Sequence, residues 1–179
     1  MDISLPKLKA ILLYFGNNTD TKYLGKVKLM KLFYFLDFLH VKRYGSPVTY
    51  DRYVHLEHGP IPQGIKNLID TAADDLDNSL LTDTITFERP QGIDMVRMLP
   101  KRVFSNTDKN YLSETEMEIL EFVCAKFGNK NTKYVEDLSH QEAPWLKTQS
   151  LEDIPYSLAA EDTDCQIAKE DIKLLEKII

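Results

Sequence analysis

The chain has little of several features that would assign a protein class directly. Its cysteines, Cys124 and Cys165, form no spacing motif, so we expect two free thiols in a reducing cytoplasm and no disulfide framework. No apolar run reaches the roughly 20 clean residues that a membrane span needs, so no membrane partner is expected. Pro6 and Lys7 interrupt the first apolar run, which argues against a signal peptide. These absences favour a cytoplasmic protein.

Positive charge is also scarce. The chain carries 22 Lys and Arg against 28 Asp and Glu, and the net charge of −6 disfavours a general nucleic-acid coat, which needs clustered cations. The sequence contains no Gly-rich phosphate loop, no nucleophile elbow and no Cys-x-x-Cys pair. We therefore expect a protein that is not an enzyme, with no catalytic residue, no metal site and no cofactor.

What the chain does contain is a stretch from residue 24 to residue 40 that is apolar nearly all round at helical spacing. Its two apolar stripes comprise Leu29, Leu32, Phe33, Leu36 and His40, and Val27, Met30, Tyr34, Phe38 and Val41. Only Lys28, Lys31 and Lys42 form a polar strip. A helix of this kind is buried, so we expect the central helix of one domain, with other helices on both sides. Gly45 and Pro47 end it.

The remaining pattern predicts a mainly helical (α+β) fold with a small antiparallel β-sheet. Further helices are expected at 5–15 (with a left-handed exit at Gly16), from Pro62 to about 74, at 114–127, at 132–140 and at about 168–178. Ser113 and Glu116 form a capping box that starts the 114–127 helix. A strand at 50–56, a rigid turn at 57–62 and a hairpin at 83–99 would make the sheet.

We expect the 179 residues to form a single domain. The core is expected at about 5–147, and a C-terminal segment, 148–179, carries the last helix. The stretch 147–164 is expected to be less ordered.

Several polar residues invite a functional interpretation, and each has a structural alternative. Asp37 inside the apolar helix needs a partner, for which Lys26, His40 and Arg43 are candidates, and a structural pair is favoured over a catalytic acid. His55-x-x-His58 has a metal-compatible spacing but lacks further ligands. The acidic run at 74–78 lacks the glycine and terminal glutamate of a calcium loop, which favours a solvated loop.

Two further segments leave alternatives open. The helices at 114–127 and 132–140 could form a helix-turn-helix, but Glu136 and Asp137 on the second helix would repel phosphate, so plain packing is favoured. Trp145 is either a binding anchor or a buried clamp for the last segment, and the sequence alone does not separate the two roles.

Three blocks carry a resemblance to a known family. They are residues 28–35, residues 53–62 with Glu57-His58-Gly59-Pro60 at their centre, and Leu138-Ser139-His140 followed by Pro144-Trp145. In this order and spacing they resemble the Panacea domain family, the SocA-like antitoxins, which are also phage-associated proteins. The candidate partner-binding or motif residues are Lys28, Lys31, Tyr34, Glu57, His58, Gly59, Pro60, His140, Pro144 and Trp145.

The resemblance implies an antitoxin that neutralises a cognate toxin by direct protein–protein binding, as part of a type II-like toxin–antitoxin operon. Some relatives act as adaptors that deliver the toxin to a protease, and a DNA-binding regulator of the operon is the alternative. Family members neutralise toxins of many folds, so the motif residues would form a framework. Lys28 and Lys31 would then pair with acids, and binding would fall on the hairpin 83–99, the loop 74–78 and the tail after Trp145.

Overall fold

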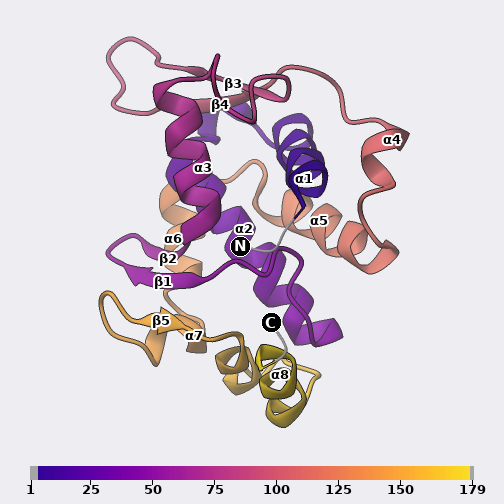
Figure 1. The fold of residues 1–179 in the computed structure, drawn as a ribbon. Coiled ribbons are helices and arrows are strands. Elements are labelled where there is room, and N and C mark those ends of the chain that lie inside the picture. The colour runs from indigo at the N-terminus through magenta and orange to yellow at the C-terminus, as the bar shows by residue number, and fades with distance from the viewer. Residues whose placement is uncertain (1–3, 178–179) are drawn as a thin grey trace.

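The computed structural model describes residues 4–177, and one long helix runs through the middle of it (Figure 1). This helix, α2 (Lys26–Tyr44), contacts α3 (Gln63–Asp74), α5 (Glu114–Phe127), α6 (Thr132–Ser139), β2 (Gly59–Pro62) and η2 (Tyr156–Glu161). All its residues from Lys28 to Lys42 are buried. The prediction of a mainly helical domain around a buried central helix is therefore confirmed.

Local signals set the ends of several helices. Gly45 ends α2 with a φ of 86° and donates its N–H to the Val41 carbonyl. Both hydrogen bonds of the predicted capping box at Ser113 and Glu116 are present at the start of α5. The expected left-handed exit at Gly16 is wrong, because α1 (Leu5–Asn18) continues through it. A Cβ at Gly16 would lie 2.9 Å from the Pro100 side chain, so the missing side chain allows the strand that ends at Pro100 to pack closely.

Two small antiparallel sheets flank the helices, where the sequence predicted one. β1 (Tyr53–Leu56) pairs with β2 on one side and with β5 (Asp153–Ile154) on the other. The predicted hairpin forms as β3 (Ile85–Glu88) and β4 (Arg97–Pro100), but it is a separate sheet near α1. The expected rigid turn at 57–62 is also wrong, since only residues 57 and 58 turn and the two prolines lie in β2.

The C-terminal third packs against the same core. The stretch 147–164, expected to be less ordered, contains β5 and η2, and Ile154, Tyr156 and Ala159 are buried in the core cluster. The short helices α4 (Asn106–Lys109) and α7 (Ala143–Leu146) precede α5 and β5, and η1 (Thr21–Tyr23) precedes α2. The last helix, α8 (Lys169–Glu176), buries Ile172, and its predicted end at 178–179 lies outside the described residues. The division at residue 147 stays a prediction.

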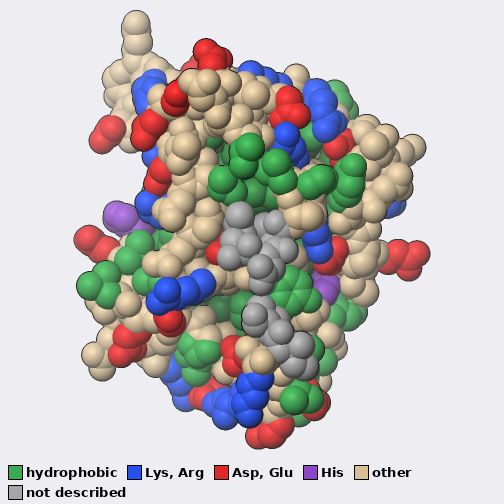
Figure 2. Space-filling view, in the orientation of Figure 1, with side chains coloured by type: hydrophobic (Ala, Val, Ile, Leu, Met, Phe, Trp, Pro, Cys, Tyr) green, Lys and Arg blue, Asp and Glu red, His purple; other side chains and the backbone are tan. Residues whose placement is uncertain are grey.

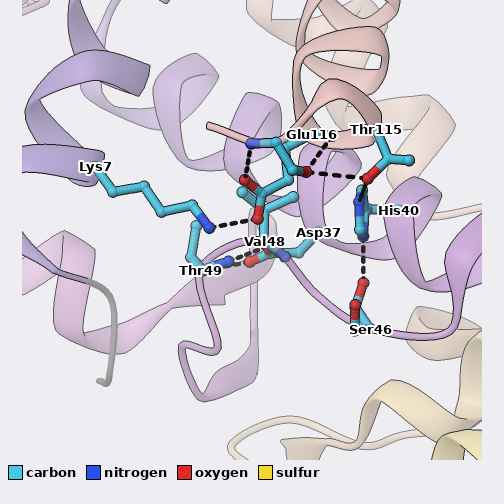
Figure 3. Close-up of polar contacts among 9 residues, drawn as sticks. Lys7, Asp37, His40, Ser46, Val48, Thr49, Thr115 and Glu116 are labelled. Atoms are coloured by element: carbon cyan, nitrogen blue, oxygen red, sulfur yellow. Dashed lines mark hydrogen bonds and ion pairs between the residues drawn. The ribbon is translucent and has the colours of Figure 1, made fainter. Parts of the chain in front are cut away.

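Polar contacts tie the helices together around the middle of α2 (Figure 3). Lys7 of α1 forms an ion pair with Glu116 of α5. The ring of His40 lies between the Ser46 carbonyl, 2.5 Å from Nδ1, and the Thr115 hydroxyl, 3.1 Å from Nε2. His40 is therefore a cross-link between α2 and α5 and not the expected partner of Asp37.

Asp37 is fully buried and holds the chain between α2 and β1. Its Oδ1 accepts the N–H groups of Val48, at 2.8 Å, and Thr49, at 2.7 Å. Its Oδ2 accepts the hydroxyls of Thr49 and Tyr53, the latter at 2.8 Å. The expected partners Lys26, His40 and Arg43 are thus wrong, because the carboxylate faces the returning chain and not its own helix.

No helix among the described residues is long and apolar enough to cross a membrane.

We predict that Asp37→Ala lowers the free energy of unfolding by about 3–5 kcal/mol, because several buried donors lose their acceptor. Asp37→Asn keeps an oxygen for the two N–H groups and should cost about 1 kcal/mol at pH 7. Urea unfolding measures both values, and equal losses in the two variants would contradict the role of the acceptor.

Wild type and Asp37→Asn should also differ in how their stability depends on pH. Burial raises the pKa of Asp37 from 3.8 to about 6. As pH rises through this window, the unfolded chain releases its proton first, so wild-type stability falls relative to Asp37→Asn by about 1–3 kcal/mol. Unfolding curves at pH 4.5 and pH 7 test this, and parallel behaviour of the two proteins would show that Asp37 does not titrate in this range.

Candidate functional site

The three sequence blocks meet on one side of α2. Block one is α2 itself, block two is the β1–β2 hairpin, and block three spans the end of α6 and α7. The helix α6 contacts both α2 and β2, so residues more than 100 positions apart become neighbours. We call this meeting point the motif core.

Lys28 ties the α5–α6 connection to α2. Its side chain is fully buried, and its Nζ donates to the carbonyls of Gly128, at 2.8 Å, and Lys130, at 2.6 Å. Burial lowers the pKa of Lys28 to about 8, since a closed site disfavours the charged form. The expected pairing with an acid is wrong here, because backbone oxygens that lack helical partners take its place.

Lys31 holds the hairpin in the same way. Its fully buried Nζ donates to the Pro60 carbonyl at 2.8 Å, and burial lowers its pKa to about 7. Gly59 has a φ of 98°, and a Cβ there would lie 2.7 Å from the Lys31 Nζ and 2.9 Å from the Ser139 Oγ. At Gly59, side chains of α2 and α6 therefore lie close to the backbone of β2, and a Cβ there would overlap them.

Trp145 lies between two histidines. Its ring stacks on His55 at 3.4 Å and on His140 at 4.2 Å between centroids, so both faces of the half-buried indole are covered. Burial lowers the pKa of both histidines. Pro144 is buried in the first turn of α7 and places the ring. Whether Trp145 is an anchor or a clamp stays a prediction, and both stacking partners of its ring belong to this chain.

The two histidines of the His55-x-x-His58 pattern do not converge. His55 faces Trp145, with its Nδ1 2.9 Å from the Thr148 hydroxyl, whereas the side chain of His58 is 63% exposed and its Nδ1 lies 3.6 Å from Glu136. Within residues 4–177, no group of three or more His, Cys, Asp or Glu residues could hold a metal ion.

A cluster of ionised groups joins Tyr34 and Lys42 to the C-terminal segment. The Tyr34 hydroxyl donates to Glu142 at 2.8 Å. The Lys42 Nζ, almost completely buried, lies 3.0 Å from carboxylates of Glu142, Asp162 and Asp164. Burial alone would lower the pKa of Lys42, but these acids outweigh burial and raise it. Sequence reasoning missed this cluster, because its acids follow Lys42 by 100 residues or more and no local pattern connects them.

Beside the motif core, the surface is hollowed into a groove of about 550 Å³. Its lining residues come from α2, the β1–β2 hairpin, α3 and the turn before β5: Lys26, Val27, Met30, Leu56, Glu57, His58, Ile61, Lys66, Ile69, Asp70, Ser150 and Leu151. Val27, expected in a buried stripe, is 36% exposed here, and Leu151 is 76% exposed. In Figure 2, hydrophobic side chains gather at the left edge, over the hairpin and β5.

This arrangement divides the predicted site residues into three groups. His140, Pro144 and Trp145 belong to the stacked ring cluster with His55. Lys28, Lys31, Tyr34, Gly59 and Pro60 are buried, and their polar atoms are occupied by other parts of the chain. Glu57 and His58 are exposed at the rim of the groove. The buried group can position segments but offers no open site for a substrate, so the groove is the part of this region that can contact another molecule.

Comparison with protein families found a match to this chain. The family model described as "Antitoxin SocA-like, Panacea domain" matches residues 29–146, about two thirds of the chain. The matched range covers most of α2, both hairpins, and α3 to α7. Comparisons with curated proteins and with solved structures found no match.

The close approach at Gly59 gives a stability prediction with an internal control. Gly59→Ala combines a left-handed backbone with a steric overlap and should lower the free energy of unfolding by about 2–4 kcal/mol. Gly92 has a φ of 76°, but a Cβ there would meet nothing within 4 Å, so Gly92→Ala should cost only about 1 kcal/mol. Thermal or urea unfolding compares them, and similar losses would mean that the space at Gly59 is not limiting.

The Lys42 cluster gives a second prediction. Lys42→Gln leaves three carboxylates without their cation and should cost about 3–5 kcal/mol, with faster proteolysis after residue 147. Lys66, which pairs with Asp70 at the surface, is the control, and Lys66→Gln should change stability by about 0.5 kcal/mol or less. Limited proteolysis with mass spectrometry measures cleavage after residue 147. Unchanged cleavage in Lys42→Gln would contradict the role of Lys42 in holding the C-terminal segment.

Proposed function

The chain belongs to the SocA-like antitoxin family with a Panacea domain, and on this premise we propose that it neutralises a cognate toxin protein by direct binding. The observation that carries the proposal is the family match over residues 29–146, which includes all but the first residue of the three blocks. The proposed action is non-catalytic: the protein occupies a surface that the toxin needs and forms or breaks no bond.

The interior of the site supports this proposal. The buried motif residues make their polar contacts inside the chain, as Lys31 does with the Pro60 carbonyl and Tyr34 with Glu142. A framework held in this way presents its outer surface, the groove included, with little internal freedom, and a pre-organised surface loses less entropy on binding. The net charge of −6 favours encounter with a basic toxin, since complementary charge raises association rates more than affinity.

Neutralisation by direct binding and delivery of the toxin to a protease give different results with purified proteins. If direct occupancy neutralises the toxin, the two purified proteins suffice, and inhibition should saturate at a fixed molar ratio. An adaptor would instead leave the toxin active in the purified mixture and lower its abundance only in cells that contain the protease.

The deciding experiment starts from the genes on either side. Each neighbouring product is expressed from an inducible promoter, alone and together with this chain, and growth is followed. One neighbour should arrest growth alone, and co-expression should restore growth and allow the two proteins to co-purify. A stop codon at Lys7 of this chain is the matched control, because it keeps the RNA and removes the protein. Failure with every neighbour contradicts the proposal.

A gel-shift titration with the upstream promoter accompanies this test. DNA binding at low salt without any contact to a neighbouring product would favour a transcriptional regulator instead.

A further inference from the structure

The groove beside the motif core has features that select its occupant. Its floor is formed by buried apolar side chains, Met30, Ile61 and Ile69, and its charged groups all stand at the rim. Sites for small polar ligands place a few polar groups inside the cavity to fix the ligand's orientation. An apolar floor with a charged rim instead resembles a protein interface, which has an apolar centre and a polar border.

Leu151 is held out into the groove by a strained backbone. It has a φ of 71°, which is uncommon for a residue with a branched side chain, and its side chain is 76% exposed. Its N–H donates to the His55 carbonyl at 2.8 Å, and the His55 N–H returns a bond to the Glu152 carbonyl at 2.9 Å. The turn is therefore fixed to β1, and the fold tolerates strain to place an apolar side chain in solvent at the rim.

An added β-strand does not fit as the occupant. β2 forms one edge of the three-stranded sheet, but it is buried along its length, and two of its four residues are prolines without an N–H. The Pro60 carbonyl is already taken by Lys31. The opposite edge, β5, offers only two residues. Strand addition needs a row of free backbone groups, so side chains must supply the contacts here.

The charges at the rim are distributed unequally. On the α3 side, Lys26 and Lys66 share Asp70, at 2.7 and 2.6 Å, which leaves an excess of one positive charge. On the side of the β1–β2 hairpin, Glu57 is exposed and makes no ion pair or side-chain hydrogen bond with any residue of the described chain. A partner segment with a basic residue over Glu57 and an acidic residue near Lys66 would satisfy both sides.

We infer that the groove receives an amphipathic helix of the toxin. Its apolar stripe packs between Val27 and Leu151, and a Lys or Arg on it pairs with Glu57. An α-helix satisfies its own backbone hydrogen bonds, so it suits a groove that offers apolar side chains and no backbone partners. This inference rests on the proposed function and adds the surface, the kind of segment and its charge.

The test uses the purified neighbouring-gene product that arrests growth, with binding measured by calorimetry. Leu151→Asn should weaken binding about 10-fold or more, as truncation of an interface anchor does. Asparagine tolerates a positive φ, so the melting temperature of this variant should stay equal or rise. Val103→Asn is the matched control, because Val103 is 77% exposed outside the groove, and its affinity should match wild type.

Charge is tested separately. Glu57→Lys should slow association about 10-fold at low salt, whereas Glu121→Lys, an exposed residue of α5, should not. Overlapping peptides from the toxin should compete only where they contain a helical segment with a basic residue beside its apolar stripe.

The outcomes separate this inference from the proposed function. Neutralisation with full affinity in Leu151→Asn overturns the groove and leaves the antitoxin role intact, and so does competition by a non-helical peptide. A chain that is dimeric alone and becomes monomeric in Leu151→Asn would assign the groove to a second copy, which overturns the inference as well. If no neighbouring product is neutralised by wild type, both proposals fall.

Discussion

Three buried lysine amino groups on one helix hold three other parts of this chain in place. Lys28, Lys31 and Lys42 all lie on α2, and each finds its oxygen partners in a different segment: the α5–α6 connection, the β1–β2 hairpin and the C-terminal third. A buried charge without partners is far more costly than a lost apolar contact. Misplacing any of these segments would leave a buried lysine amine without its oxygen acceptors, so the lysines favour this arrangement over others that bury the same apolar side chains.

The sequence predicts the parts of this structure that depend on neighbours along the chain. The apolar rod of α2, its end at Gly45, the capping box at Ser113 and the hairpin after residue 83 all follow from local spacing. What it misses are partners that only folding brings together. Asp37 is bound by the chain that returns after α2, and Lys42 by acids 100 or more residues away. The prolines and glycine of 57–62 predict a rigid turn, but the edge strand β2 accommodates both prolines because its outer side needs no N–H.

In the candidate site, too, the local sequence predicts the individual segments but not the contacts between them. The blocks at 28–35, 53–62 and 138–145 are visible in the sequence, yet their meeting point is not, because it depends on the close approach of α2, β2 and α6 at Gly59. The groove is harder to predict, since Leu151 lies in the segment expected to be less ordered. Its positive φ and its hydrogen bond to the His55 carbonyl become visible only in the structure. A framework whose polar atoms are occupied internally leaves the rim residues free to differ without loss of the fold, and such a surface can suit different partners.

The prolines of β2 have a consequence for the protein when it is alone. An open apolar groove beside a sheet is a hazard in a concentrated solution, because exposed sheet edges recruit further strands and lead to fibrous aggregates. Here the edge next to the groove has no donors to offer at Pro60 and Pro62 and is covered by other elements. The chain can therefore expose an apolar groove without offering this sheet edge as a template for further strands.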